Sequence, residues 1–126
     1  MSRCGFPSLW LFSAGALLLF GCGAGEKNEA QAGDVTAHPD YQKGLDLATK
    51  HKCFVCHKID EPFTGPSYRD IANKYAGASA AEISELAGKI IHGSTGVWGN
   101  VPMIAHPAIP EEDAETLVRY ILLLKK

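Results

Sequence analysis

The spacing of hydrophobic residues divides the chain into three parts. Residues 9–20 are apolar and uncharged, residues 23–38 have almost no large apolar side chain, and the remainder carries short apolar stripes separated by turn residues. A stripe that repeats every three to four residues indicates an amphipathic helix. The pattern predicts one helical domain over residues 39–126, preceded by a short apolar run and by a polar segment that cannot form a core.

Four helices are predicted within this domain. The first two cover residues 39–50 and residues 67–76, and the second stops at Gly77. The third begins at Ser79, because Ser79 and Glu82 have the spacing of a capping box, and it ends at residues 92–93. The last begins near Pro110, a residue suited to the first helical position, and continues to the end of the chain. No segment alternates convincingly as a strand, so the predicted fold class is all-α with long loops.

The N-terminal apolar run has the features of an export signal. Arg3 precedes it, and residues 9–20 are too few for a bilayer span, which needs roughly 20 apolar residues. Residues 19–22 (LFGC) resemble a bacterial lipobox, which predicts a lipoprotein-type signal peptide over 1–21 and lipid attachment at Cys22; ordinary secretion is the alternative. Residues 22–38 would then form a flexible tether between the membrane and the domain.

Composition excludes some classes of function. The formal net charge is -2, which gives no reason to expect nucleic acid as a partner. The four cysteines fall at Cys4, Cys22, Cys53 and Cys56. Their positions indicate unrelated roles, so the even count does not predict a disulfide framework.

Cys53, Cys56 and His57 form the motif C-x-x-C-H, which is typical of covalent haem attachment. One turn of chain brings two thiols to the two vinyl groups of the macrocycle, and the histidine that follows can ligate the iron. A zinc site would need a second ligand pair, and no second C-x-x-C exists. A redox dithiol or a structural disulfide would leave the histidine without a role. The motif therefore predicts one covalent haem c.

The second axial ligand is expected far along the chain. Once the signal peptide is removed, Met103 is the only methionine, and it lies in the glycine- and proline-rich segment GSTGVWGNVPMIAHPAIP. Methionine and histidine together raise the reduction potential of haem iron. Met103 is the predicted ligand, and His92 and His106 are the rivals.

Three further segments carry a family resemblance. GPSYRDIANKYAG, ELAGKIIHGSTGVWGNVPM and EEDAETLVRYILLLKK resemble the small bacterial class I cytochromes of the c-551/c-552 type, over about residues 40–126. The resemblance implies the class I cytochrome c fold, with the carbonyl of Pro66 bonded to His57 and the indole of Trp98 bonded to a haem propionate. Lys89 stands where relatives often place an arginine against that propionate, and Lys52 replaces a glycine before the first cysteine.

These features predict a monomeric one-electron carrier of a bacterial periplasmic respiratory chain and no enzyme activity. Its expected partners are redox proteins, such as a cytochrome complex as donor and a terminal reductase or oxidase as acceptor. A further prediction is a positive patch around the attachment motif, formed by Lys43, Lys50, Lys52 and Lys58. Two alternatives stay open: an enzyme or gas-binding protein with a labile sixth ligand, and a dedicated subunit of a membrane redox complex.

Overall fold

A computed structural model describes residues 34–126 of the chain. The predicted signal peptide, the predicted lipid site Cys22 and most of the predicted tether therefore lie outside the described residues. The last part of the expected tether is folded: Val35–Ala37 form a short 3-10 helix (η1), and the side chain of Asp34 accepts a hydrogen bond from the backbone N–H of Thr36.

The four predicted helices are present, and their starts agree with the sequence signals. They are α1 (Pro39–Lys50), α2 (Tyr68–Lys74), α3 (Ala80–His92) and α4 (Glu111–Leu123). Each of the first three begins after a side chain that accepts a backbone N–H at its first turn: His38, Ser67 and Ser79. Pro110 precedes α4 as its N-cap rather than serving as its first helical residue.

The capping box predicted for α3 forms in full. Ser79 Oγ accepts from the backbone N–H of Glu82 at 3.3 Å, and Glu82 Oε2 accepts from the backbone N–H of Ser79 at 2.8 Å. The two hydrogen bonds satisfy two backbone donors that a helix N-terminus would otherwise leave unpaired. The start of α3 is therefore fixed by local chemistry, which explains why the sequence located it.

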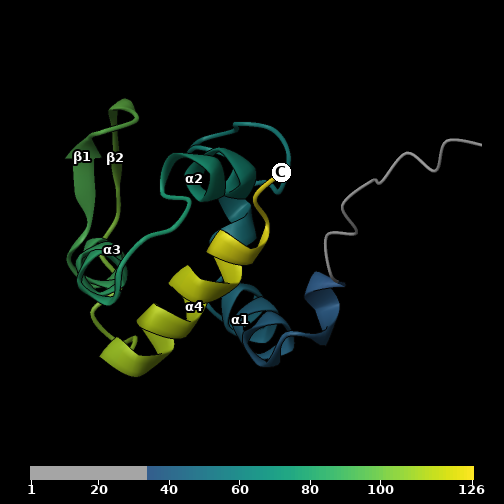
Figure 1. The fold of residues 1–126 in the computed structure, drawn as a ribbon. Helices are drawn as coiled ribbons and strands as arrows, with labels where there is room; N and C mark the ends of the chain where they lie inside the picture. The colour runs from purple at the N-terminus through teal and green to yellow at the C-terminus, as the bar shows by residue number, and fades with distance from the viewer. Residues whose placement is uncertain (1–33) are drawn as a thin grey trace, which may run out of the picture.

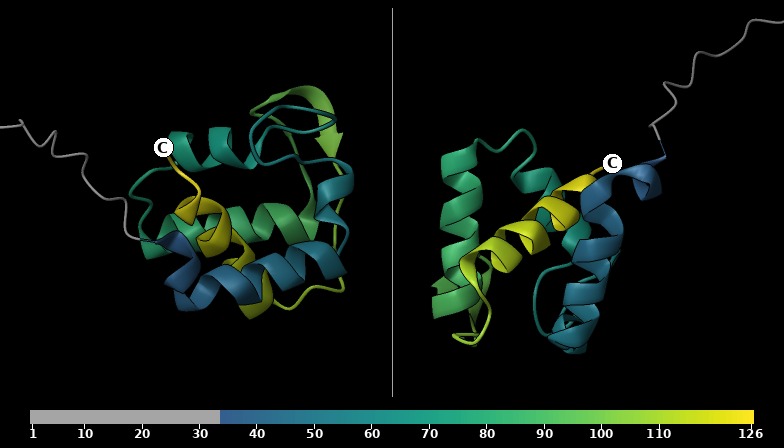
Figure 2. Two further views of the ribbon diagram at one scale, coloured as in Figure 1. Left: turned by 90° about the vertical axis from the view of Figure 1, so that its right-hand side faces the viewer. Right: turned by 90° about the horizontal axis from the view of Figure 1, so that it is seen from below.

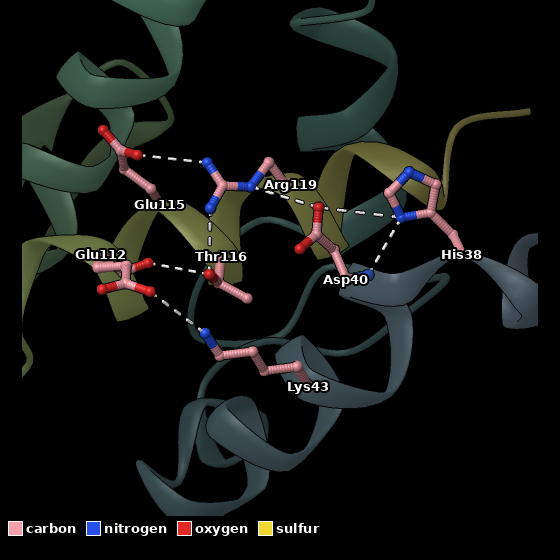
Figure 3. Close-up of polar contacts among 7 residues, drawn as sticks. All are labelled: His38, Asp40, Lys43, Glu112, Glu115, Thr116 and Arg119. Carbon is pink, nitrogen blue, oxygen red and sulfur yellow. Dashed lines mark hydrogen bonds and ion pairs between the residues drawn. The ribbon is translucent and has the colours of Figure 1, made fainter.

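Helix α4 runs through the middle of the molecule and packs against α1, α2 and α3 (Figure 1). Its buried face supplies more of the core than any other element, including Leu117 and Tyr120, which are almost fully buried. A polar network joins the outer faces of α1 and α4, where Arg119 contacts Asp40 at 3.3 Å and Lys43 contacts Glu112 at 3.7 Å (Figure 3). The crossing of α1 and α4 thus combines an apolar contact with a polar border.

The domain is mostly helical, as predicted, but it also contains two short strands that the sequence did not indicate. Ser94–Gly96 (β1) and Gly99–Met103 (β2) pair as an antiparallel hairpin, with Gly96 opposite Gly99. Both of these glycines have positive φ, which favours glycine at the turn. Almost every residue of the two strands is exposed, so neither strand has a buried face and no alternation of apolar and polar residues marks them.

The hairpin lies on the side of the molecule away from the C-terminus and from the first described residues (Figure 2). A second 3-10 helix, η2 (Cys53–Val55), follows α1 directly. Within residues 34–126, no helix is long and apolar enough to cross a membrane.

Candidate functional site

A cavity of about 480 Å³ lies between the hairpin, the η2 turn and the helices. This volume falls within the range of roughly 300–1,000 Å³ that small-molecule and cofactor sites occupy. Much of its wall is apolar and comes from α2, α3, α4 and β2. The structure brings all seven residues predicted for haem binding to this cavity: Cys53, Cys56, His57, Pro66, Lys89, Trp98 and Met103.

His57 is the most buried of the polar residues that line the cavity and is held in one orientation. Its Nδ1 lies 2.8 Å from the carbonyl oxygen of Pro66, and its ring packs against Tyr68 with centroids 5.5 Å apart. A carbonyl can only accept a hydrogen bond, so Nδ1 carries the proton. The neutral ring is then left with an unprotonated Nε2, which is the form that binds a metal.

The two cysteines lie on the turn that follows α1. The backbone N–H groups of Cys56 and His57 both donate to the carbonyl of Cys53, at 3.2 Å and 3.0 Å, which coils the motif tightly. Lys52 precedes the first cysteine in the left-handed conformation, with φ of 57°, a conformation that glycine adopts more readily than lysine. Both thiols are free and half-buried rather than joined in a disulfide.

Cys53 has an environment that keeps its thiol protonated before any reaction. Burial raises the pKa of Cys53 above its ordinary value, although a hydrogen bond from the hydroxyl of Tyr68 partly opposes this shift. Burial also raises the pKa of Tyr68, so the phenol stays neutral. Sequence reasoning missed Tyr68 as a site residue, because its contacts with Cys53 and His57 form only in the folded chain.

Met103 ends strand β2 and is half-buried on the cavity wall. The base of the hairpin is tight there, because a Cβ on Gly93 would lie 2.7 Å from the carbonyl oxygen of Met103. Gly93 also has a φ of 79°, which disfavours any other residue. Gly93 therefore fixes how the chain leaves α3 and where β2 brings Met103 back.

The structure gives Trp98 and Lys89 neighbours that the sequence did not suggest. Trp98 lies at the hairpin turn, half-exposed, with Lys74 Nζ 5.6 Å from its ring centre. Lys89 Nζ pairs with Glu85 Oε1 at 2.9 Å, and the hydrogen bond from this pair raises the pKa of Lys89. Lys89 is therefore charged and already has an acidic partner.

The rival histidines differ in position. His106 lines the cavity, and its backbone N–H donates to the carbonyls of Ile90 and Ile91. His92 is exposed at the end of α3 and is not part of the cavity wall. His51, which sequence reasoning overlooked, also lines the cavity, and its buried Nε2 has no hydrogen-bond partner among residues 34–126.

The donor set fits a covalently attached haem better than a bare metal ion. Nowhere in the described part of the chain do three or more His, Cys, Asp or Glu side chains gather as metal ligands would. Two free thiols, an imidazole with a free Nε2 and a thioether instead share one largely apolar cavity. These are the groups that attachment and axial ligation of a haem require.

Comparison with known proteins gives a consistent result. A sequence profile of the cytochrome c family matches residues 41–125. Cytochrome c-552 of Nitrosomonas europaea is 44% identical over 84 residues, which cover 67% of this chain and 81% of that protein. Cytochrome c-551 of Pseudomonas aeruginosa is 39% identical over 94 residues, which cover 74% of this chain and 88% of that protein.

Solved structures agree with the sequence matches. The crystal structure of the Nitrosomonas europaea cytochrome superposes with a TM-score of 0.60 at 44% identity and covers 64% of this chain and 99% of its own. A class 1 cytochrome of Sideroxydans lithotrophicus ES-1 gives a TM-score of 0.54 at 28% identity, over 66% of this chain and 94% of its own.

Proposed function

Because this chain belongs to the cytochrome c family, we propose that it carries single electrons in the bacterial periplasm through a haem iron ligated by His57 and Met103. It is an electron-transfer protein of the c-551/c-552 type rather than an enzyme, and it binds one covalent haem c. The observation that carries the ligation proposal is the shared cavity, since side chains from η2, the following loop and β2 all reach it.

The residues around the cavity have three kinds of task in this proposal: attachment of the haem, ligation of its iron and orientation of a ligand. Cys53 and Cys56 hold the macrocycle through thioether bonds, and His57 presents its Nε2 to the iron. The carbonyl oxygen of Pro66 accepts a hydrogen bond from Nδ1–H of His57, with the two atoms 2.8 Å apart. This bond fixes the ring and makes it a better electron donor to the metal. Met103 offers a thioether, which favours the ferrous state.

The haem, when bound, supplies the one-electron chemistry, and the protein supplies the setting. Apolar wall residues such as Leu86, Ile90 and Leu117 keep water away from the iron. As two strong ligands, His57 and Met103 would keep the surroundings of the iron the same in both oxidation states. Little reorganisation is then needed, which suits a carrier that must exchange electrons rapidly.

The propionate contacts follow from the same cavity. We assign Trp98 as an indole N–H donor to a haem propionate, because it lines the cavity at the hairpin turn. Lys89 also lines the cavity, but its pair with Glu85 means that its charge is shared between that carboxylate and a propionate. Lys89 lacks the planar fork of the arginine that relatives often have, so it makes at most a point-charge contact.

The docking surface is proposed to lie at the rim of the cavity. Val55, Val101 and Ile104 line the cavity and are more than half exposed, so they form an apolar border around its opening. Lys52 lines the cavity, Lys58 follows His57 directly in the chain, and neither has an ion-pair partner within residues 34–126. Lys43, in contrast, is paired with Glu112 and contributes less to the positive patch. A redox partner with an acidic rim around an apolar centre fits this surface.

Export and anchoring also belong to the proposal. A signal peptide over 1–21, a lipid on Cys22 and a tether over 22–38 would hold a monomeric domain at the membrane surface. The first described residues and the hairpin lie on different sides of the molecule, so a membrane attachment would leave the cavity rim accessible (Figure 2). Globomycin treatment, which blocks lipoprotein signal cleavage, should leave an uncleaved precursor if Cys22 is lipidated and have no effect otherwise.

Absorption spectra of the haem-matured protein test the ligation. With His57 and Met103 on the iron, the ferric protein shows a far-red sulfur-to-iron band, and the reduced protein does not respond to carbon monoxide. Met103→Ala should abolish the band and admit carbon monoxide, whereas His106→Ala should leave both properties unchanged. A high-spin ferric spectrum of the unsubstituted protein would contradict Met103 as ligand, although the haem attachment would stand.

A further inference from the structure

Gly65 lies against the imidazole of His57 more closely than any side chain would allow. A Cβ placed on Gly65 would lie 2.6 Å from His57 Cε1 and 2.9 Å from His57 Nδ1. Both distances are shorter than ordinary contact, and the atoms concerned belong to a rigid ring. Only glycine lets the backbone approach the ring at this distance.

The loop that carries Gly65 cannot easily move away from His57. The backbone N–H of Gly65 donates to the carbonyl of Cys56 at 2.9 Å, and its own carbonyl accepts from Phe63 at 3.0 Å. Immediately after the loop, the N–H of Tyr68 donates to the carbonyl of Lys58 at 2.9 Å. Hydrogen bonds thus join the loop to the attachment motif and the residue after it at two places, Gly65 and Tyr68.

The next residue, Pro66, holds the hydrogen bond that orients His57. Its carbonyl oxygen lies 2.8 Å from His57 Nδ1, and Pro66 follows Gly65 directly in the chain. A side chain on Gly65 would push the ring and the loop apart. The bond between His57 and Pro66 would lengthen as a result, because the two atoms it joins lie on the two parts being separated.

We propose that Gly65 is a positioning residue for electron transfer, whose missing side chain sets the length of the His57–Pro66 hydrogen bond and thereby the donor strength of His57. The inference rests on the proposed role of His57 as an iron ligand. A short bond at Nδ1 increases electron donation from Nε2 and stabilises ferric iron, which lowers the reduction potential. Lengthening the bond should have the opposite effect.

Gly65→Ala tests the proposal in the haem-matured protein. The first readout is the exchange with solvent of the His57 Nδ1–H proton, followed by NMR in the diamagnetic ferrous state. We expect exchange to be about tenfold faster than in the unsubstituted protein, the factor that corresponds to loss of a typical hydrogen bond. The second readout is the reduction potential, which should rise.

Gly44→Ala is the matched control, because Gly44 is also a tightly packed glycine, but its contacts are with Tyr120 and Thr116 at the crossing of α1 and α4 rather than with His57. It should lower stability without moving the Nδ1–H signal or the potential. If Gly65→Ala only lowers stability, as Gly44→Ala does, and leaves both readouts at their original values, the positioning role is refuted.

A measurement on the unsubstituted protein covers the case in which Gly65→Ala does not mature. A short bond to Pro66 predicts one slowly exchanging Nδ1–H resonance, and a rapidly exchanging proton would overturn the proposal. If the proposed Met103 ligation is wrong, the far-red band is absent. The exchange of the His57 Nδ1–H proton is measured separately by NMR, so that failure can be told apart from failure of the Gly65 proposal.

Discussion

Gly44 on α1 packs directly against Tyr120 on α4. Among the glycines of the described chain, Gly44 leaves the least room for a Cβ. A Cβ on Gly44 would overlap the Cβ of Tyr120 and would lie 3.2 Å from the carbonyl oxygen of Thr116. Tyr120 is almost fully buried, and its ring meets Tyr41 of α1 edge to face at 5.5 Å. Burial raises the pKa of Tyr120 to about 12, so its phenol stays neutral at this contact.

Gly44→Ala should therefore force α1 and α4 apart. Overpacking of a close-packed core costs about 1–3 kcal/mol of unfolding free energy, and the short contact with Tyr120 favours the upper end of this range. Denaturant unfolding of the haem-matured protein, followed by circular dichroism, measures the change.

Gly88→Ala provides the comparison. Gly88 lies within α3, and a Cβ there would meet nothing within 4 Å. Alanine is the better helix former, so this variant should be more stable by about 0.5–1 kcal/mol. Equal effects of the two substitutions would mean that the α1–α4 contact is looser than the structure indicates.

Glu82 should make stability depend on acid pH. Hydrogen bonds from the backbone N–H and the hydroxyl of Ser79 lower the pKa of Glu82 below its ordinary value. Because the folded pKa lies below the unfolded one, the stabilisation is complete above the unfolded value and is lost as the pH falls through the folded value. Unfolding free energy should thus fall less between about pH 5 and about pH 3 in Glu82→Gln than in the unsubstituted protein.

Glu61→Gln is the control for this pH dependence. Glu61 is exposed and has no side-chain hydrogen bond within residues 34–126, so removing its charge should leave the acid slope unchanged. If Glu82→Gln also keeps the original slope, the capping box does not contribute through the ionised carboxylate.

The helices could be predicted from sequence because their ends depend on neighbours in the chain. Ser79 and Glu82 form their capping box within one turn, and Ser67 caps α2 through Asp70 in the same way. The hairpin could not be predicted, because its strands bury neither face and so leave no periodic signal. Its turn depends instead on the positive φ of Gly96 and Gly99.

The candidate site also has one part that local sequence predicts and another part that forms only when distant segments meet. The motif at Cys53, Cys56 and His57 is local, so its spacing alone indicated haem. The close approach of Gly65 and the stacking of Tyr68 on His57 arise when the loop folds back onto the motif, and no spacing rule reports them. The buried Nε2 of His51 was missed for a similar reason, since its burial depends on distant chain segments.

Lys74 is expected to stabilise the position of the hairpin that carries Met103. Its Nζ lies 5.6 Å from the ring centre of Trp98 and 5.8 Å from that of Tyr75, so a cation–π contact links α2 to the hairpin turn. Such contacts are worth about 0.5–1 kcal/mol at exposed sites. Lys74→Met should therefore let added imidazole displace Met103 from ferric iron more readily, as a spectral titration would show.

Lys58→Met is the matched control for Lys74→Met. It removes a similar contact, in which Lys58 Nζ lies 5.1 Å from the ring centre of Phe63, but this contact does not involve the hairpin. Imidazole should bind this variant as it binds the unsubstituted protein. If both variants bind imidazole equally well, the contact between Lys74 and Trp98 does not hold Met103 in place.

The unpaired charge of Lys52 should govern electron exchange at the cavity rim. Lys52 lines the cavity and has no ion-pair partner in the described chain, so it attracts negatively charged redox partners. Lys52→Gln should slow oxidation of the ferrous protein by hexacyanoferrate(III) at low ionic strength and speed oxidation by a cationic cobalt complex. Both differences should shrink as added salt screens the charge.

Lys125→Gln changes the net charge equally, but at the C-terminal end of the chain, away from the hairpin (Figure 2). In stopped-flow measurements the Lys125 variant should differ little from the unsubstituted protein, and equal slowing by the two substitutions would show that net charge, rather than the position of Lys52, controls the rate.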